Sequence, residues 1–150
     1  GSSYLLYTYT YEQKTSGSDI ITYVGKKDIT SWAGGMSDDC TMFTNGVEVP
    51  LNYLYIAKGR DLWRTSYESQ TAPQVAKSFP APITAAEVIM NDPKSISNTS
   101  TELYTAVFTY DSSAKTAKMY VLDAKTDDLK AYSEVETAIP GKVVRYRANQ

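Results

Sequence analysis

Tyrosines alternate with other residues near the start of the chain, and this spacing favours a β-strand. Residues 4–11 read YLLYTYTY, so Tyr7, Tyr9 and Tyr11 recur at a spacing of two. In a strand such residues share one face, and tyrosine and threonine both favour strands. Pieces typical of turns, such as SGSD, KGRD, NDP and DSS, divide the rest of the chain into similar short runs. The sequence therefore predicts an all-β protein, and its one weak helix candidate, residues 72–77, suits a strand equally well.

Three segments, residues 6–24, 52–66 and 102–123, share an order of strand, polar turn and strand. In this comparison Trp63 stands in the place of Tyr23 and Tyr120. A fourth short strand and a Pro or Gly break extend the pattern, and four short strands per unit are typical of propeller blades. We therefore expect one all-β domain of about three antiparallel, propeller-like blades, with a β-sandwich as the alternative. The expected units cover residues 4–35, 40–80 and 86–149.

Three blades are fewer than a closed propeller typically has. We therefore expect the chain to be a fragment of a longer protein or an open stack. The C-terminal run KVVRYRAN, residues 142–149, is a candidate to complete the first blade. Open sheet edges also predict self-association through edges or docking onto an upstream domain.

The run LYTAVFTYDSSAKTAKMYVLDAKTDDLKAYSEV, residues 103–135, resembles β-propeller repeats of the YVTN type. The texture of the whole chain is similar to the propeller portion of PKD-like surface lipoproteins of Gram-negative bacteria. This resemblance implies a binding role outside the cytoplasm, in an extracellular, cell-surface or periplasmic location.

The composition narrows the classes of function. The 150 residues include no histidine and one cysteine, Cys40, which removes Ser-His-Asp and Cys-His catalysis, internal disulfides and cysteine-based zinc sites. A net charge of −2 without a basic run disfavours nucleic-acid binding. No apolar stretch reaches the roughly 20 residues of a membrane span. We expect no cofactor, no metal and no catalytic residue.

Candidate ligand-binding residues lie in one loop and at the ends of short strands. Trp32 precedes AGGMSDDC, a loop in which an aromatic ring and two acids suit contact with a sugar or a peptide. Asparagines end the short runs, and arginines lie in the last one. The predicted ligand-binding set is Trp32, Asp38, Asp39, Asn45, Asn91, Arg145 and Arg147.

The tyrosine run itself is predicted to be core between blades, because its positions match Tyr53, Tyr55 and Ala57 in the second unit and Tyr104, Ala106, Phe108 and Tyr110 in the third. Tyr11, near the hairpin tip, suits core and surface equally. The function predicted from all of this is a non-enzymatic binding or scaffold module for a glycan or a protein. The alternative is a fragment of a carbohydrate-active hydrolase or lyase.

Overall fold

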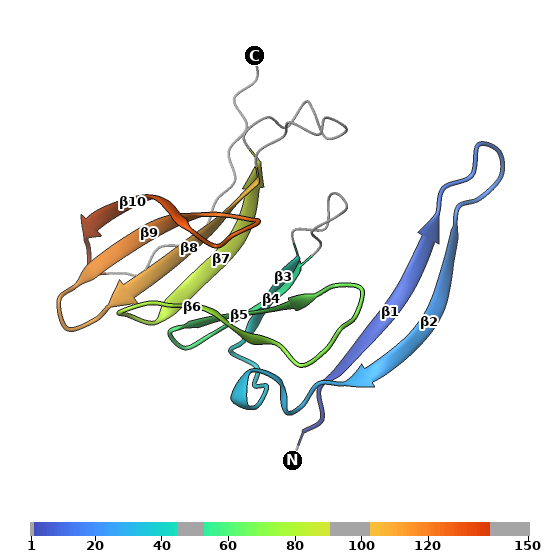
Figure 1. Ribbon diagram of the computed structural model, residues 1–150, viewed down its shortest axis with the longest axis horizontal. Helices are drawn as coiled ribbons and strands as arrows, with labels where there is room; N and C mark the ends of the chain where they lie inside the picture. Colours follow the sequence, from blue (N-terminus) through green and yellow to red (C-terminus); the bar gives the residue numbers. More distant parts are fainter. Residues whose placement is uncertain (1, 45–52, 91–102, 139–150) are drawn as a thin grey trace. The chain divides into compact units, whose positions relative to one another are not determined.

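The computed structural model describes residues 2–44, 53–90 and 103–138. These residues form three antiparallel sheets of two, four and four strands, none of which closes into a barrel (Figure 1). The all-β prediction is confirmed. The chain divides into two compact units, Gly1–Asp38 and Asp39–Gln150.

The first unit is built on a long hairpin of β1 (Leu5–Glu12) and β2 (Ile20–Asp28). A short 3-10 turn, η1 (Trp32–Gly34), follows it. Hydrogen bonds close the base of the hairpin: the Ile29 N–H donates to the Tyr4 carbonyl at 2.9 Å, and the Tyr4 hydroxyl donates to Asp38 Oδ1 at 2.6 Å.

The second unit begins with a four-stranded sheet in chain order. Its strands are β3 (Thr41–Thr44), β4 (Tyr53–Lys58), β5 (Asp61–Ser66) and β6 (Gln74–Ser78). Gly59 takes a positive φ in the tight turn between β4 and β5, a conformation that costs glycine little. The weak helix candidate at residues 72–77 lies mostly in strand β6, where Trp63 pairs with Val75.

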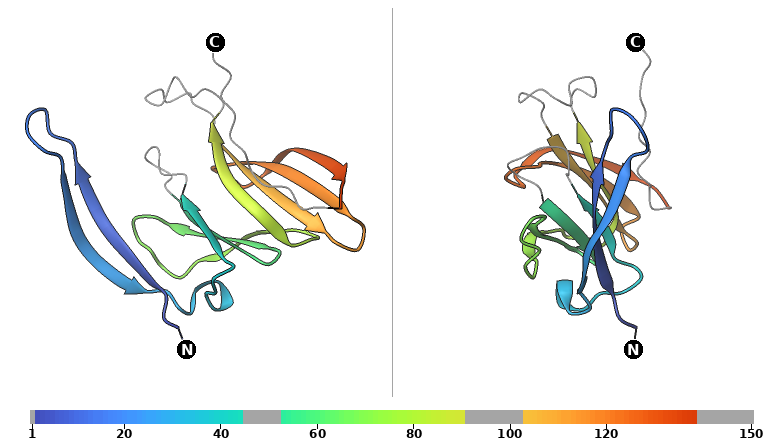
Figure 2. Two further views of the ribbon diagram at one scale, coloured as in Figure 1. Left: turned by 180° about the vertical axis from the view of Figure 1, so that it is seen from behind. Right: turned by 90° about the vertical axis from the view of Figure 1, so that its right-hand side faces the viewer.

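The second sheet of this unit also follows chain order, with strands β7 (Ile83–Met90), β8 (Leu103–Asp111), β9 (Thr116–Asp123) and β10 (Leu129–Glu136) (Figure 2). Aspartates shape its turns. Asp111 Oδ1 accepts the Ser113 and Ala114 N–H groups, and Asp123 Oδ1 accepts those of Lys125 and Thr126. Such side-chain acceptors replace backbone partners in a tight turn.

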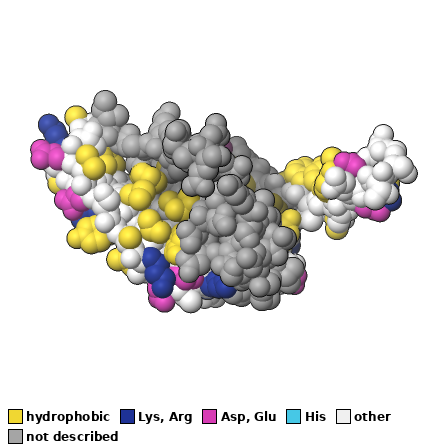
Figure 3. All heavy atoms as spheres, turned by 90° about the horizontal axis from the view of Figure 1, so that it is seen from above, with side chains coloured by type: hydrophobic (Ala, Val, Ile, Leu, Met, Phe, Trp, Pro, Cys, Tyr) yellow, Lys and Arg dark blue, Asp and Glu magenta, His cyan; other side chains and the backbone are white. Residues whose placement is uncertain are grey.

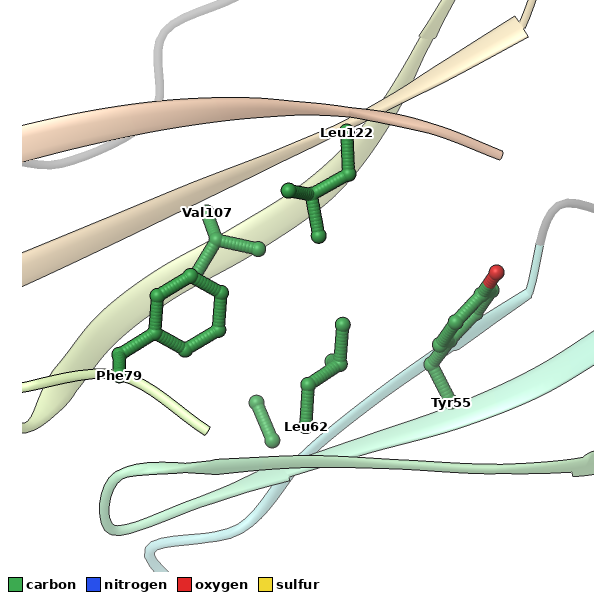
Figure 4. Packing of buried hydrophobic residues seen from close by; sticks show 6 residues of the cluster. Tyr55, Leu62, Phe79, Val107 and Leu122 are labelled. Atoms are coloured by element: carbon green, nitrogen blue, oxygen red, sulfur yellow. The ribbon is translucent and has the colours of Figure 1, made fainter. Parts of the chain in front are cut away.

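The core of the second unit lies between its two sheets. Tyr55, Ala57 and Leu62 from the first sheet meet Val107 and Leu122 from the second, with Phe79 from the connection between the sheets. Figure 4 shows Leu62 and Leu122 pointing toward one another across this layer. Tyr55 and Ala57 were predicted to be core, and their burial confirms that prediction.

Candidate ligand-binding face

The hairpin of the first unit presents one face that carries its aromatic rings. Residues directly opposite one another in an antiparallel pair share a face. Tyr7 pairs with Lys26, Tyr9 with Tyr23, and Tyr11 with Ile21. We call this side of β1 and β2 the tyrosine face.

A β-bulge at Val24 brings Tyr23 onto the tyrosine face. Thr8 pairs with Gly25, but the next residue, Tyr9, pairs with Tyr23, so Val24 is the extra residue. Without this bulge Tyr9 would face Val24, and Tyr23 would lie on the opposite side with the threonines. The bulge therefore gathers aromatic rings from both strands onto one side.

The rings form a connected row that is open to solvent. The ring centroids of Tyr9 and Tyr23 are 5.6 Å apart, and those of Tyr7 and Tyr23 are 6.4 Å apart. The exposed fractions are 51% for Tyr7, 54% for Tyr9, 63% for Tyr11 and 52% for Tyr23. Figure 3 shows hydrophobic side chains on this hairpin, with polar and charged side chains at its tip.

Charged side chains border the row at both ends. At the tip, the Tyr11 hydroxyl donates to Asp19 Oδ2 at 2.5 Å, which raises the pKa of Tyr11 and lowers that of Asp19. At the base, Asp28 Oδ1 accepts the Thr30 hydroxyl at 2.6 Å, and this bond lowers the pKa of Asp28. Both carboxylates are therefore anionic at neutral pH. The face carries aromatic rings along its middle and a carboxylate at each end, and Lys26, opposite Tyr7, adds a cation near the base.

The prediction that the tyrosine run forms core is wrong for this hairpin. Among the described residues of the first unit, no second layer covers the tyrosine face, whereas the corresponding Tyr55 face of the second unit is covered by a neighbouring sheet. Alternation of large residues revealed a shared face in both cases. It did not reveal which of the two faces has a sheet packed against it.

Three of the residues predicted to bind ligand, Trp32, Asp38 and Asp39, lie in the described part of the chain. Trp32 is only 6% exposed, within η1. Asp38 is exposed and accepts the Tyr4 hydroxyl, and Asp39 is exposed in the turn before β3. The remaining predicted residues, Asn45, Asn91, Arg145 and Arg147, lie outside the described residues. The ligand role of the set stays a prediction.

A buried polar cluster joins the two sheets of the second unit. Arg64 of β5 forms an ion pair with Asp127 in the β9–β10 turn. The Tyr55 hydroxyl lies 3.2 Å from Asp127 Oδ1 and 3.2 Å from the Ala124 carbonyl. Arg64 also lies over the Tyr53 ring, 4.2 Å from its centroid. Aspartates in turns are usually solvated turn formers, and it is the packing of β4 and β5 against this turn that gives Asp127 these partners.

Burial governs the ionisation of this cluster. Burial raises the pKa of Asp127, and Arg64 and the Tyr55 hydroxyl oppose that rise. Burial and the neighbouring Asp127 carboxylate raise the pKa of Tyr55 far above its ordinary value. A phenol that holds its proton so firmly is a poor general base. We therefore interpret the cluster as a structural one that holds the two sheets of the second unit together.

A pocket of 180 Å³ opens over β8, β9 and β10 of the second unit, lined in part by Asp111, Lys118, Tyr120 and Glu134. Two carboxylates therefore border one pocket. However, Glu134 pairs with Lys118 at 3.3 Å, and Asp111 accepts the two N–H groups of its own turn. Both carboxylates are engaged in structural contacts.

The exposure of the tyrosine face was missed by sequence reasoning, which aligned Tyr23 with Tyr120. One signal was available: Gly25 follows Val24 inside a strand, and glycine in a strand often marks a bulge.

Within residues 2–44, 53–90 and 103–138, no group of three or more His, Cys, Asp or Glu side chains is placed to hold a metal ion. Over the same ranges, no helix has the length and apolar character to cross a membrane. No protein-family model, curated protein or solved structure matches this chain.

Proposed function

We propose that this chain is a non-enzymatic binding module that holds a glycan chain on the tyrosine face. The observation that carries the proposal is the exposure of four tyrosines on one face, three on β1 and one on β2. Monomeric proteins rarely expose a contiguous apolar patch without a use for it.

The chemistry of the face suits a sugar chain. A pyranose ring has an apolar C–H side and a rim of hydroxyls, and a tyrosine offers an apolar ring and a hydroxyl in the same way. Tyrosines two residues apart in a strand are spaced by about 6.6 Å, so Tyr7, Tyr9 and Tyr11 form an extended row. The Asp19 and Asp28 carboxylates at the ends supply acceptors for sugar hydroxyls.

The stacking direction of the four-stranded sheets supports a propeller-like architecture over a sandwich. In each sheet the second strand places an aliphatic residue opposite an aromatic one, Ile56 opposite Trp63 and Val107 opposite Tyr120. Tyr120 packs toward the first sheet, and its ring centroid lies 4.9 Å from that of Phe79. Trp63 is next to Leu62, which faces the core between the sheets, so Trp63 points away from the second sheet. Corresponding faces thus point in one direction, as in stacked blades. A location outside the cytoplasm belongs to this proposal and rests on the resemblance alone.

The alternative, a carbohydrate-active enzyme, has less support. Its best candidate is the pocket bordered by Asp111 and Glu134, where both carboxylates are engaged as described above. Tyr55 and Arg64 also come together, but they do so around the buried Asp127 carboxylate. Binding without chemistry therefore fits the described side chains better.

The proposal is tested by removing rings from the tyrosine face. A glycan array identifies a ligand, and calorimetry measures its affinity for the intact chain and for variants. We expect Tyr9→Ala and Tyr23→Ala each to weaken affinity by about fivefold, because a lost ring contact is worth on the order of 1 kcal/mol.

The matched control is Tyr132→Ala. Tyr132 is 64% exposed on β10, in the other unit, and we expect its removal to leave affinity unchanged. The proposal is abandoned if no glycan binds, or if Tyr132→Ala weakens binding as much as the hairpin variants do.

A further inference from the structure

The outer edge of β1 differs from the other strand edges in the described residues. Among those residues β1 pairs only with β2, so one side of its backbone has no strand beside it. Over Leu5–Tyr11 the strand carries no charged side chain. A long uncharged edge strand is a ready template for another strand.

The other edges carry features that discourage pairing. β2 has the bulge at Val24 followed by Lys26 and Lys27. β10 carries Lys130, Glu134 and Glu136, β6 is short and carries Lys77, and β3 has four residues. β7 carries Glu87 and contacts β3 and β4. Charges, bulges and short length are the devices by which proteins protect sheet edges, and β1 lacks all three up to Glu12.

We propose that β1 pairs antiparallel with β1 of a second copy of this chain. The sequence of β1 suits self-pairing, because LLYTYTY alternates almost symmetrically about Thr8. A two-fold axis at Thr8 sets Tyr7 opposite Tyr9 of the partner copy, and Leu5 opposite Tyr11. The result is a sheet of four strands, β2-β1-β1-β2, matching the strand number of the other two sheets.

The register follows from the pleat. When the two-fold axis passes through a residue, all tyrosines of both copies lie on one side of the joined sheet. A shift of the pairing by one residue would instead place tyrosines beside threonines. Uncharged side chains from Leu5 to Tyr11 also avoid the like-charge contacts that a two-fold axis would otherwise double. The proposal concerns assembly and does not depend on what the tyrosine face binds.

The test uses opposite charges at the two-fold axis. Thr8 lies on the side away from the tyrosines and pairs with Gly25 of β2. In sedimentation equilibrium we expect the intact chain to show a dimer, and Thr8→Lys and Thr8→Glu each to weaken dimerisation about fivefold or more, because like charges would face one another. An equimolar mixture of the two variants should recover the dimer, because opposite charges then meet.

Thr22→Lys is the matched control. Thr22 lies on the same side of the hairpin but on β2, opposite Thr10, and we expect it to leave the dimer intact. Recovery by mixing also separates lost pairing from a misfolded hairpin. A chain that sediments as a monomer at every concentration, a dimer that both Thr8 variants leave intact, or a mixture that recovers nothing overturns the proposal.

Discussion

Leu62→Ala is expected to destabilise the second unit by about 2–5 kcal/mol, the range for removing a buried leucine side chain from a packed core. Leu62 of β5 has no exposed surface and lies between the two four-stranded sheets, near Leu122 (Figure 4). Truncation removes apolar burial and leaves a cavity that neither sheet is free to fill. Urea unfolding followed by tryptophan fluorescence measures the loss.

The control for this prediction is Leu129→Ala. Leu129 begins β10 and is 47% exposed, so the same truncation should cost well under 1 kcal/mol because water already reaches the side chain. Equal losses in the two variants would show that the layer between the sheets is not the core of this unit.

Arg64→Met is expected to cost about 2–4 kcal/mol at neutral pH, because it leaves the Asp127 carboxylate buried without its cation. This loss of stability is expected to be somewhat smaller than for a fully buried ion pair, because Arg64 is partly exposed and water can reach the site. Arg60→Met removes an exposed arginine from the neighbouring β4–β5 turn and should have little effect. Urea unfolding compares the two variants.

The cost of Arg64→Met should depend on pH. Burial raises the pKa of Asp127 above its ordinary value of 3.8 in the folded chain, and Arg64 opposes that rise. Between 3.8 and the raised value the folded chain binds more protons than the unfolded chain, so this group lowers stability as the pH increases. Removing Arg64 raises the pKa of Asp127 further.

The loss in free energy of unfolding caused by Arg64→Met should therefore be largest at neutral pH. It should shrink in acid, where Asp127 is protonated and needs no cation. Unfolding measured at a series of pH values checks this trend, and the double variant Arg64→Met with Asp127→Asn should remove it. A deficit that stays constant with pH in the single variant would contradict a role for the buried charge.

Much of the fold was predictable because strands and turns leave local marks. Tyrosine and threonine alternation predicted β1, the KGRD turn predicted the hairpin of β4 and β5, and the DSS turn predicted that of β8 and β9. Each of these signals spans a few neighbouring residues. That is why strands were predicted correctly over most of the described chain, including residues 74–78, where a helix had remained an option, although the short η1 was not predicted.

The candidate site was less predictable because it depends on distant partners. Alternation showed that Tyr7, Tyr9 and Tyr11 share a face, but burial depends on whether another layer lies over that face. Tyr55 has such a layer, and Tyr9 has none among the described residues of its own unit. Asp127 shows the same limit, since its role comes from Arg64, a residue 63 positions earlier in the chain.

The all-β class and the hairpins could be predicted from the sequence, because strand propensity and turn residues act over a few neighbouring positions. The absence of histidine chemistry followed from composition alone. Packing between distant segments buries the Tyr55 face, whereas the tyrosine face is exposed and the bulge at Val24 places Tyr23 on it; neither the exposure nor the bulge was predicted from local pattern. The physical reason is that a strand's pattern specifies two faces, while burial is a property of what packs against each.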